Sequence, residues 1–164
     1  MNVYQVLVER LASELRKRNA RIATAESCTG GWIAKVLTDM PGSSAWFEYG
    51  FVSYGNNAKT TMLGVNPVLI EKYGAVSAEV AEAMVTGALA VSGAQLALAV
   101  TGIAGPEGGT PDKPVGTVWF AFAAAGRGVV SDCKHFAGDR DTVRRQTVST
   151  ALTGVLKYLE KSGG

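Results

Sequence analysis

The sequence predicts a three-layer α/β/α domain with a mixed five-stranded sheet, and two observations carry this prediction. Segments with the spacing of amphipathic helices alternate along the chain with short apolar segments typical of strands. In addition, Gly126-Arg127-Gly128 separates two apolar segments and indicates a hairpin, which adds an antiparallel pair of strands. The 164 residues contain no repeat and no linker, so residues 1–164 are predicted to form a single domain.

The first half of the chain is predicted to begin with a helix. Val3, Leu7, Leu11 and Leu15 recur every four residues and form an apolar stripe that ends near Arg18. The elements expected next are a strand at 21–26, a helix at 32–39, a loop at 40–44, an aromatic-rich strand at 47–54, and helices at 56–63 and 67–74.

The second half is predicted to add three strands and two helices. Ser77 is a candidate N-cap for a helix that runs to about Ser92, and Asp139 or Asp141 is a candidate N-cap for the last helix. The remaining expectations are a strand at 96–101, a long loop at 102–114, strands at 115–125 and 129–136, and frayed residues at 161–164. The core side of the last helix should carry Val148, Leu152, Val155, Leu156 and Leu159.

Composition excludes several classes of function. A net charge of +2 is too small to favour nucleic acid as a partner. No apolar run reaches the ~18 residues of a membrane span, and the first ten residues lack a signal-peptide pattern. We therefore expect a cytoplasmic protein with free thiols at Cys28 and Cys133. A single histidine and scattered carboxylates favour neither a metal site nor any other cofactor.

The segment Glu26-Ser27-Cys28-Thr29-Gly30-Gly31 joins a predicted strand to a predicted helix. The first N–H groups of a helix have no partner inside it, so they can bind a phosphate or stabilise an oxyanion above such a turn. Ser27 lies where a nucleophile would be presented. A simpler interpretation also stays open, in which Ser27 or Thr29 is only an N-cap and the glycines only form a tight turn.

A nucleophilic serine needs a base, and the sequence offers two candidates. Lys59 follows the aromatic strand close to Tyr54, where burial could lower its pKa. An ordinary solvated lysine is the alternative at this position. His135 lies on a predicted strand and is a weaker candidate, because a lone histidine on a strand is more often a packed or surface residue.

Two further segments could bind an anion. The loop from Thr101 to Gly109 is long and rich in glycine, so its N–H groups could form an anion-binding nest, although a flexible surface loop is the alternative. Arg140 and Arg144 lie one helical turn apart, so both could face one phosphate. A solvated, salt-bridged helix face would explain these arginines and Arg145 equally well.

Five motifs in order resemble the CinA C-terminal domain family. They are Ala23-Thr24-Ala25-Glu26-Ser27-Cys28-Thr29-Gly30-Gly31, Gly42-Ser43-Ser44-Ala45-Trp46-Phe47, Thr101-Gly102-Ile103-Ala104-Gly105-Pro106, Lys113-Pro114-Val115-Gly116-Thr117-Val118 and Gly138-Asp139-Arg140. The resemblance extends from about Val6 to Leu159 and implies a three-layer fold with a mixed five-stranded sheet. It also implies hydrolysis of the carboxamide of nicotinamide mononucleotide to nicotinate mononucleotide and ammonia, a step of pyridine-nucleotide recycling.

The resemblance further assigns Ser27 as the nucleophile and Lys59 as its base. On that basis we expect the N–H groups of Cys28, Thr29 and Gly30 to stabilise the oxyanion, and Tyr54 to orient Lys59. The expected substrate-binding residues are Gly31, Thr101, Gly102, Ile103, Ala104 and Gly105, with Arg140 and Arg144 at the phosphate.

Two other functions stay open at this stage. Cys28 could be the nucleophile of a cysteine amidase, because a helix N-terminus activates a thiolate. Alternatively, the chain could be a nucleotide-binding module without catalysis, for which the same loops and arginines would suffice. A homodimer is expected, because small α/β enzymes often pair.

Overall fold

The computed structural model describes residues 2–161 and confirms the three-layer α/β/α class with a mixed five-stranded sheet. The described elements are α1 (Val3–Lys17), β1 (Ile22–Glu26), α2 (Trp32–Thr38), the 3-10 helix η1 (Ser43–Ala45), β2 (Phe47–Val52), α3 (Asn56–Leu63), α4 (Pro67–Tyr73), α5 (Ala78–Ser92), β3 (Leu96–Gly102), β4 (Thr117–Ala124), β5 (Val130–His135) and α6 (Arg140–Glu160).

The sheet has the strand order β2-β1-β3-β4-β5. β1 pairs in parallel with both β2 and β3, whereas β4 is antiparallel to β3 and to β5. The predicted hairpin is therefore confirmed. β4 and β5 are slightly shorter than predicted. β4 begins only at Thr117, because residues 114–117 form a turn in which the N–H of Thr117 donates to the carbonyl of Pro114.

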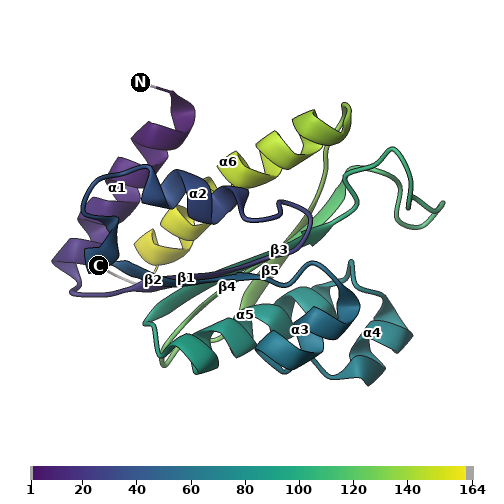
Figure 1. Cartoon of the computed structure of the whole chain (residues 1–164), viewed down its shortest axis with the longest axis horizontal. Coiled ribbons are helices and arrows are strands. Elements are labelled where there is room, and N and C mark those ends of the chain that lie inside the picture. Colours follow the sequence, from purple (N-terminus) through teal and green to yellow (C-terminus); the bar gives the residue numbers. More distant parts are fainter. Residues whose placement is uncertain (1, 162–164) are drawn as a thin grey trace.

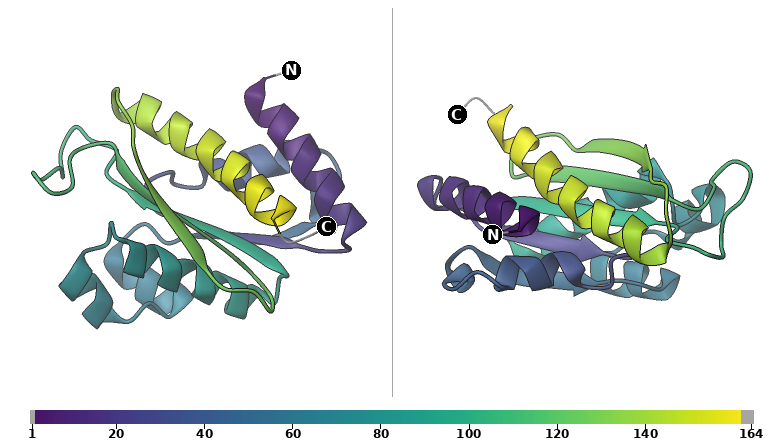
Figure 2. Two further views of the ribbon diagram at one scale, coloured as in Figure 1. Left: turned by 180° about the vertical axis from the view of Figure 1, so that it is seen from behind. Right: turned by 90° about the horizontal axis from the view of Figure 1, so that it is seen from above.

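Helices cover both faces of the sheet (Figure 1). α1, α2 and α6 lie on one face, and α3, α4 and α5 lie on the other; Figure 2 shows α6 running alongside α1. Each face has its own apolar core, and the larger core includes Leu11, Ile33 and Leu152. The five apolar residues predicted for the core side of α6 are all buried.

The helix ends correct several sequence-based expectations. Val3 is 59% exposed and does not belong to the apolar stripe, because it is the first residue of α1, directly after the N-cap residue Asn2. Ser77 caps α5, as predicted. Of the two candidates for α6, Asp139 is the cap, since its carboxylate accepts a hydrogen bond from the N–H of Thr142 at 2.9 Å. Residues 162–164, expected to fray, lie outside the described residues.

The topology places the ends of β1 and β3 beside each other. The connection from β1 to β2 runs through α2 on one face, whereas the connection from β2 to β3 runs through α3, α4 and α5 on the opposite face. Such a reversal leaves a crevice at the carboxyl ends of the central strands, where α/β proteins bind ligands. Both loops that the sequence singled out, after β1 and after β3, begin at this crevice.

Candidate active site

The turn after β1 has a fixed backbone. The N–H of Ser27 donates to the carbonyl of Val100 on β3 at 3.1 Å, and the N–H of Gly30 donates to the carbonyl of Ser27 at 3.1 Å. Gly30 and Gly31 have φ angles of 61° and 102°, which other residues rarely adopt. Because its N–H is already bonded within the turn, Gly30 is not the oxyanion donor that we expected.

The cap of α2 also differs from the prediction. Neither Ser27 nor Thr29 caps this helix, and the N-cap residue is Gly31, which has no side chain. The Glu26 carboxylate, 1% exposed, accepts hydrogen bonds from the N–H groups of Ile33 at 2.8 Å and Ala34 at 3.0 Å. These N–H groups are therefore not free to bind a phosphate. The signal in the sequence was a glutamate ending an apolar strand just before a serine, and we missed it.

The Lys59 side chain extends from α3 to the turn that follows β1. α3 covers one face of the sheet, and α2, which follows the turn, covers the other. Nζ of Lys59 lies 3.0 Å from Oγ of Ser27 and 2.9 Å from the carbonyl oxygen of Tyr54. The Lys59 side chain is 1% exposed, so the alternative of an ordinary solvated lysine is wrong. Gly87 of α5 allows this approach, because a Cβ there would collide with the carbonyl of Leu63 at the end of α3.

Burial shifts the pKa values of the two titratable groups beside Ser27. Desolvation lowers the pKa of the Lys59 ammonium below its usual value of 10.5, against a smaller opposing effect of Cys28. Desolvation raises the pKa of the Cys28 thiol to about 12, against smaller opposing effects that include the charge of Arg144. Burial therefore shifts Lys59 toward the neutral amine and Cys28 toward the protonated thiol.

A pocket of about 200 Å³ opens beside the Ser27–Lys59 pair. It is lined by Ser27, Cys28, Tyr54, Asn56, Lys59, Ala75, Val76, Thr101, Gly102, Ala104 and Arg140. The segment 75–76 forms one wall and is held in place by the Thr101 hydroxyl, which donates to the carbonyl of Ala75 at 2.9 Å. Sequence reasoning missed Asn56 and this wall, because no motif marks them.

Tyr54 and Arg140 lie at the mouth of this pocket. The Tyr54 side chain is 56% exposed, and the carbonyl of this residue, not its ring, contacts Lys59. Arg140 donates to the Tyr54 hydroxyl at 3.1 Å and to the carbonyl of Gly105 at 2.8 Å. Arg140 therefore connects Tyr54, which follows β2, to the loop between β3 and β4.

Several other expected binding residues lie elsewhere. Arg144 donates through Nε to the carbonyl of Cys28 at 3.0 Å and through Nη2 to the carbonyl of Thr29 at 3.1 Å. Arg144 and Gly31 line a neighbouring hollow with Trp32, so Arg140 and Arg144 do not face one pocket. Ile103 and Gly105 are absent from the pocket lining, and the backbone of Ile103 is paired with Gly116 and Thr117.

His135 is exposed on β5, where its main chain pairs with Thr117 of β4. Within residues 2–161, the Ser27 hydroxyl forms hydrogen bonds only with Lys59 and with the carbonyl of Tyr54, the latter at 3.3 Å. The alternative of a histidine base therefore has no support from the geometry.

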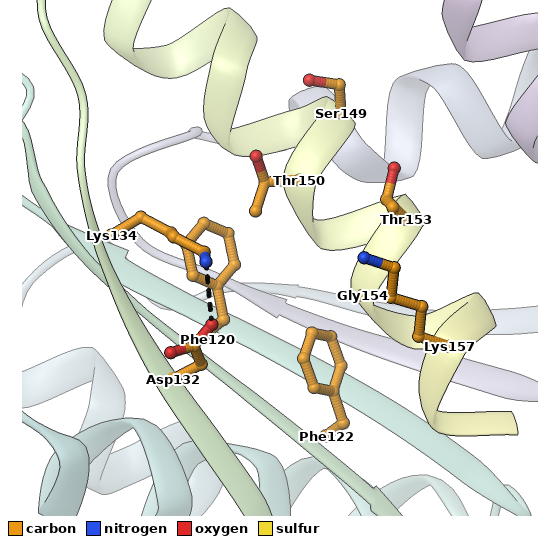
Figure 3. A pocket seen from close by; sticks show the side chains of 9 residues that line it. All are labelled: Phe120, Phe122, Asp132, Lys134, Ser149, Thr150, Thr153, Gly154 and Lys157. Carbon is orange, nitrogen blue, oxygen red and sulfur yellow. Dashed lines mark ion pairs between the residues drawn. The ribbon is translucent and has the colours of Figure 1, made fainter. Parts of the chain in front are cut away.

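A larger hollow of about 320 Å³ lies between α6 and the edge of the sheet (Figure 3). Phe120 and Phe122 lie along its sheet side, and Lys134 pairs with Asp132 at 3.3 Å. It shares no lining residue with the Ser27 pocket.

Two further properties concern the part of the chain that the structure describes. Residues 2–161 contain no group of three or more histidine, cysteine, aspartate or glutamate side chains that could hold a metal ion. None of the described helices is both long and apolar enough to span a membrane.

Fold and site together define an α/β protein with a buried serine–lysine pair at the switch point of its sheet. The profile of the CinA C-terminal domain matches residues 4–159, and the chain belongs to this family, as its motifs indicated.

Named relatives match the chain over most of its length. The nicotinamide-nucleotide amidohydrolase PncC of Pseudomonas putida is 57% identical over 157 residues, which cover 96% of this chain and 98% of the relative. The protein of the same name from Escherichia coli strain K12 is 54% identical over 146 residues, which cover 89% and 88%. The competence damage-inducible protein A of Klebsiella pneumoniae has a similar solved structure, with a TM-score of 0.93, 38% identity and coverage of 97% and 98%.

Proposed function

We propose that this protein hydrolyses the carboxamide of nicotinamide mononucleotide to nicotinate mononucleotide and ammonia, as a step in the recycling of pyridine nucleotides. The names of the relatives support the substrate, since two of them are nicotinamide-nucleotide amidohydrolases more than half identical to this chain. The observation that carries the chemistry is the 3.0 Å contact between the buried Nζ of Lys59 and Oγ of Ser27.

In the proposed mechanism, neutral Lys59 accepts the hydroxyl proton while Oγ of Ser27 attacks the amide carbon. The tetrahedral oxyanion binds the N–H groups of Cys28 and Thr29, which form no hydrogen bond with another described residue. Lys59 then gives the proton to the leaving nitrogen, which departs as ammonia. Water attacks the resulting ester with Lys59 as base again, which releases the carboxylic acid and restores Ser27.

Burial explains how a lysine can accept a proton in this mechanism. A lysine at its usual pKa of 10.5 is almost wholly protonated near pH 7, and the low exposure of Lys59 shifts the balance toward the neutral amine. The pyridinium ring of the substrate is itself positively charged. Its arrival beside Lys59 further disfavours the ammonium form.

In this proposal the two ends of the substrate bind in two parts of the site. The pocket of about 200 Å³ receives the nicotinamide ring, with Thr101, Gly102 and Ala104 along one side. Arg140 at the mouth binds the 5′-phosphate, because a guanidinium forms charge-assisted hydrogen bonds with phosphate. In this proposal the phosphate replaces one of the present partners of Arg140.

Neither alternative function explains the site as well. A cysteine amidase needs a thiolate, whereas burial raises the pKa of Cys28 to about 12. A binding module has no need for a buried amine beside a serine hydroxyl, since burying a lysine is costly. The Ser27–Lys59 pair therefore favours catalysis.

The direct test is release of ammonia from nicotinamide mononucleotide by the purified protein, by Ser27→Ala and by Ser131→Ala. Ser131 is the matched control, because its hydroxyl bonds to Glu82 outside the Ser27 pocket. The proposal predicts release by the wild type and Ser131→Ala, unchanged by chelators, and none by Ser27→Ala. Nucleotide binding without any ammonia release from the wild type would favour the binding module.

A further inference from the structure

Arg144 contacts the backbone of the Ser27–Gly31 turn from α6. Its Nε and Nη2 donate to two successive carbonyl groups, those of Cys28 and Thr29, at 3.0 and 3.1 Å. The guanidinium also lies 5.7 Å from the centre of the Trp32 ring. A guanidinium presents its donors in a rigid plane, so one side chain can fix two peptide groups at once.

These contacts determine where the N–H groups of the turn point. In a planar trans peptide the C=O and N–H directions are opposite. With the carbonyl of Cys28 held toward Arg144, the N–H of Thr29 must point away from Arg144. The N–H of Gly30, which belongs to the next peptide, is held by the carbonyl of Ser27.

Glu26 holds the same turn from its buried side. One carboxylate oxygen accepts from the Thr29 hydroxyl at 2.5 Å and from the N–H of Ile33 at 2.8 Å, and the other accepts from the N–H of Ala34 at 3.0 Å. These bonds join the turn to the first residues of α2. Glu26 thereby occupies N–H groups of α2 that could otherwise bind an anion.

We propose that Arg144 and Glu26 are positioning residues that hold the N–H groups of Cys28 and Thr29 ready for the oxyanion, and that Arg144 does not bind the substrate phosphate. This inference rests on the proposed amidase function. It gives Arg140 and Arg144 different roles. Arg140 lines the Ser27 pocket, whereas Arg144 contacts carbonyl groups of the Ser27–Gly31 turn.

The test compares three arginine variants on two substrates. Arg140→Ala, Arg144→Ala and Arg145→Ala are assayed with nicotinamide mononucleotide and with nicotinamide riboside, which lacks the phosphate. Arg145 is the matched control, because its exposed guanidinium pairs with Asp141. Melting temperatures are measured in parallel, and Arg144→Lys serves as a milder variant that can still reach one carbonyl.

Arg144→Ala should lower kcat about 100-fold for both substrates with little change in KM, because misplaced donors weaken transition-state binding. Arg144→Lys should recover part of this loss. Arg140→Ala should instead raise KM for the nucleotide, and Arg145→Ala should match the wild type. An Arg144→Ala effect confined to KM of the phosphorylated substrate would overturn the proposal.

A second readout separates this inference from the proposed substrate. A fluorophosphonate reacts with an activated serine and places a phosphoryl oxygen where the oxyanion would form. Labelling of Ser27 should be about 100-fold slower in Arg144→Ala and Glu26→Gln, but not in Arg145→Ala, even if the wild type does not hydrolyse the nucleotide. Equal labelling rates in folded Arg144→Ala and wild type would contradict the inference, as would a wild type whose Ser27 is not labelled.

Discussion

Lysine side chains line both the Ser27 pocket and the hollow between α6 and the edge of the sheet, but Lys59 and Lys134 differ in burial and in hydrogen-bonding partner. Lys59 is 1% exposed and faces a serine hydroxyl and a carbonyl oxygen. The Lys134 side chain is 50% exposed and faces a carboxylate, that of Asp132. The hollow with Lys134 is the larger of the two, at about 320 Å³ against about 200 Å³.

The size of a hollow is therefore a poor guide to its chemistry, and the burial of its polar groups is a better one. A solvated lysine beside a carboxylate keeps its charge at little cost. A lysine removed from water without a carboxylate has its pKa lowered and can act as a base.

The largest effect is expected from Ser27→Ala. Loss of the nucleophile should lower turnover at least about 10⁴-fold, whereas Ser149→Ala in the larger hollow should leave turnover unchanged. Cys28→Ala should keep most of the activity, because burial holds this thiol in its protonated form. Ammonia release measures all three, and an inactive Cys28→Ala with an active Ser27→Ala would assign the nucleophile to the cysteine.

Lys59 should be nearly as sensitive. Lys59→Met and Lys59→Arg should both remove turnover, since methionine has no basic nitrogen and a guanidinium stays charged. In the wild type, kcat/KM should rise with pH through the lowered pKa of Lys59 and then level off. Lys134→Met is the matched control and should behave as the wild type. Activity in Lys59→Arg would mean that this position supplies charge and not a base.

Arg140→Ala should have an intermediate effect. Loss of the charge-assisted bonds to phosphate should raise KM for nicotinamide mononucleotide about 10- to 100-fold. Turnover of the riboside should change far less, because it has no phosphate to lose. Steady-state kinetics on both substrates measure this difference. An equal loss of kcat/KM on both substrates would show that Arg140 does not bind the phosphate.

The smallest effect concerns stability. Between the lowered pKa of folded Lys59 and its usual value of 10.5, the unfolded chain binds more protons than the folded one. The free energy of unfolding therefore contains a contribution that rises with pH across this window, and Lys59→Met lacks it. Urea titrations at several pH values should show the wild type gaining stability relative to Lys59→Met as pH rises, with Lys134→Met as the control for loss of one charge. A difference that is flat or falls with pH would contradict burial as the cause.

Much of the fold could be predicted from the sequence, because its signals are local. The period of apolar residues predicted α6, a continuous apolar run predicted β3, and Gly126-Arg127-Gly128 indicated the hairpin. Errors arose at ends such as Val3, where the pattern continues but the helix has not yet reached the core.

The site was only partly predictable, because its contacts are non-local. Ser27 and Lys59 could be named from their motifs, but their 3.0 Å contact depends on how α3 brings Lys59 to the turn after β1. The separate positions of Arg140 and Arg144 depend on how α6 lies against the turn, which spacing along one helix does not encode. The role of Glu26 was not predicted, because two of its three partners are backbone N–H groups, which every sequence possesses.

The most direct test of the serine–lysine mechanism is to trap the covalent intermediate. The wild type is mixed with nicotinamide mononucleotide, quenched in acid within one turnover, digested and analysed by peptide mass spectrometry. The serine–lysine mechanism predicts a nicotinate mononucleotide ester on Ser27, which is absent in Ser27→Ala and in Lys59→Met. An adduct on Cys28, or ammonia release in a single turnover without any adduct, would contradict the proposed serine–lysine mechanism.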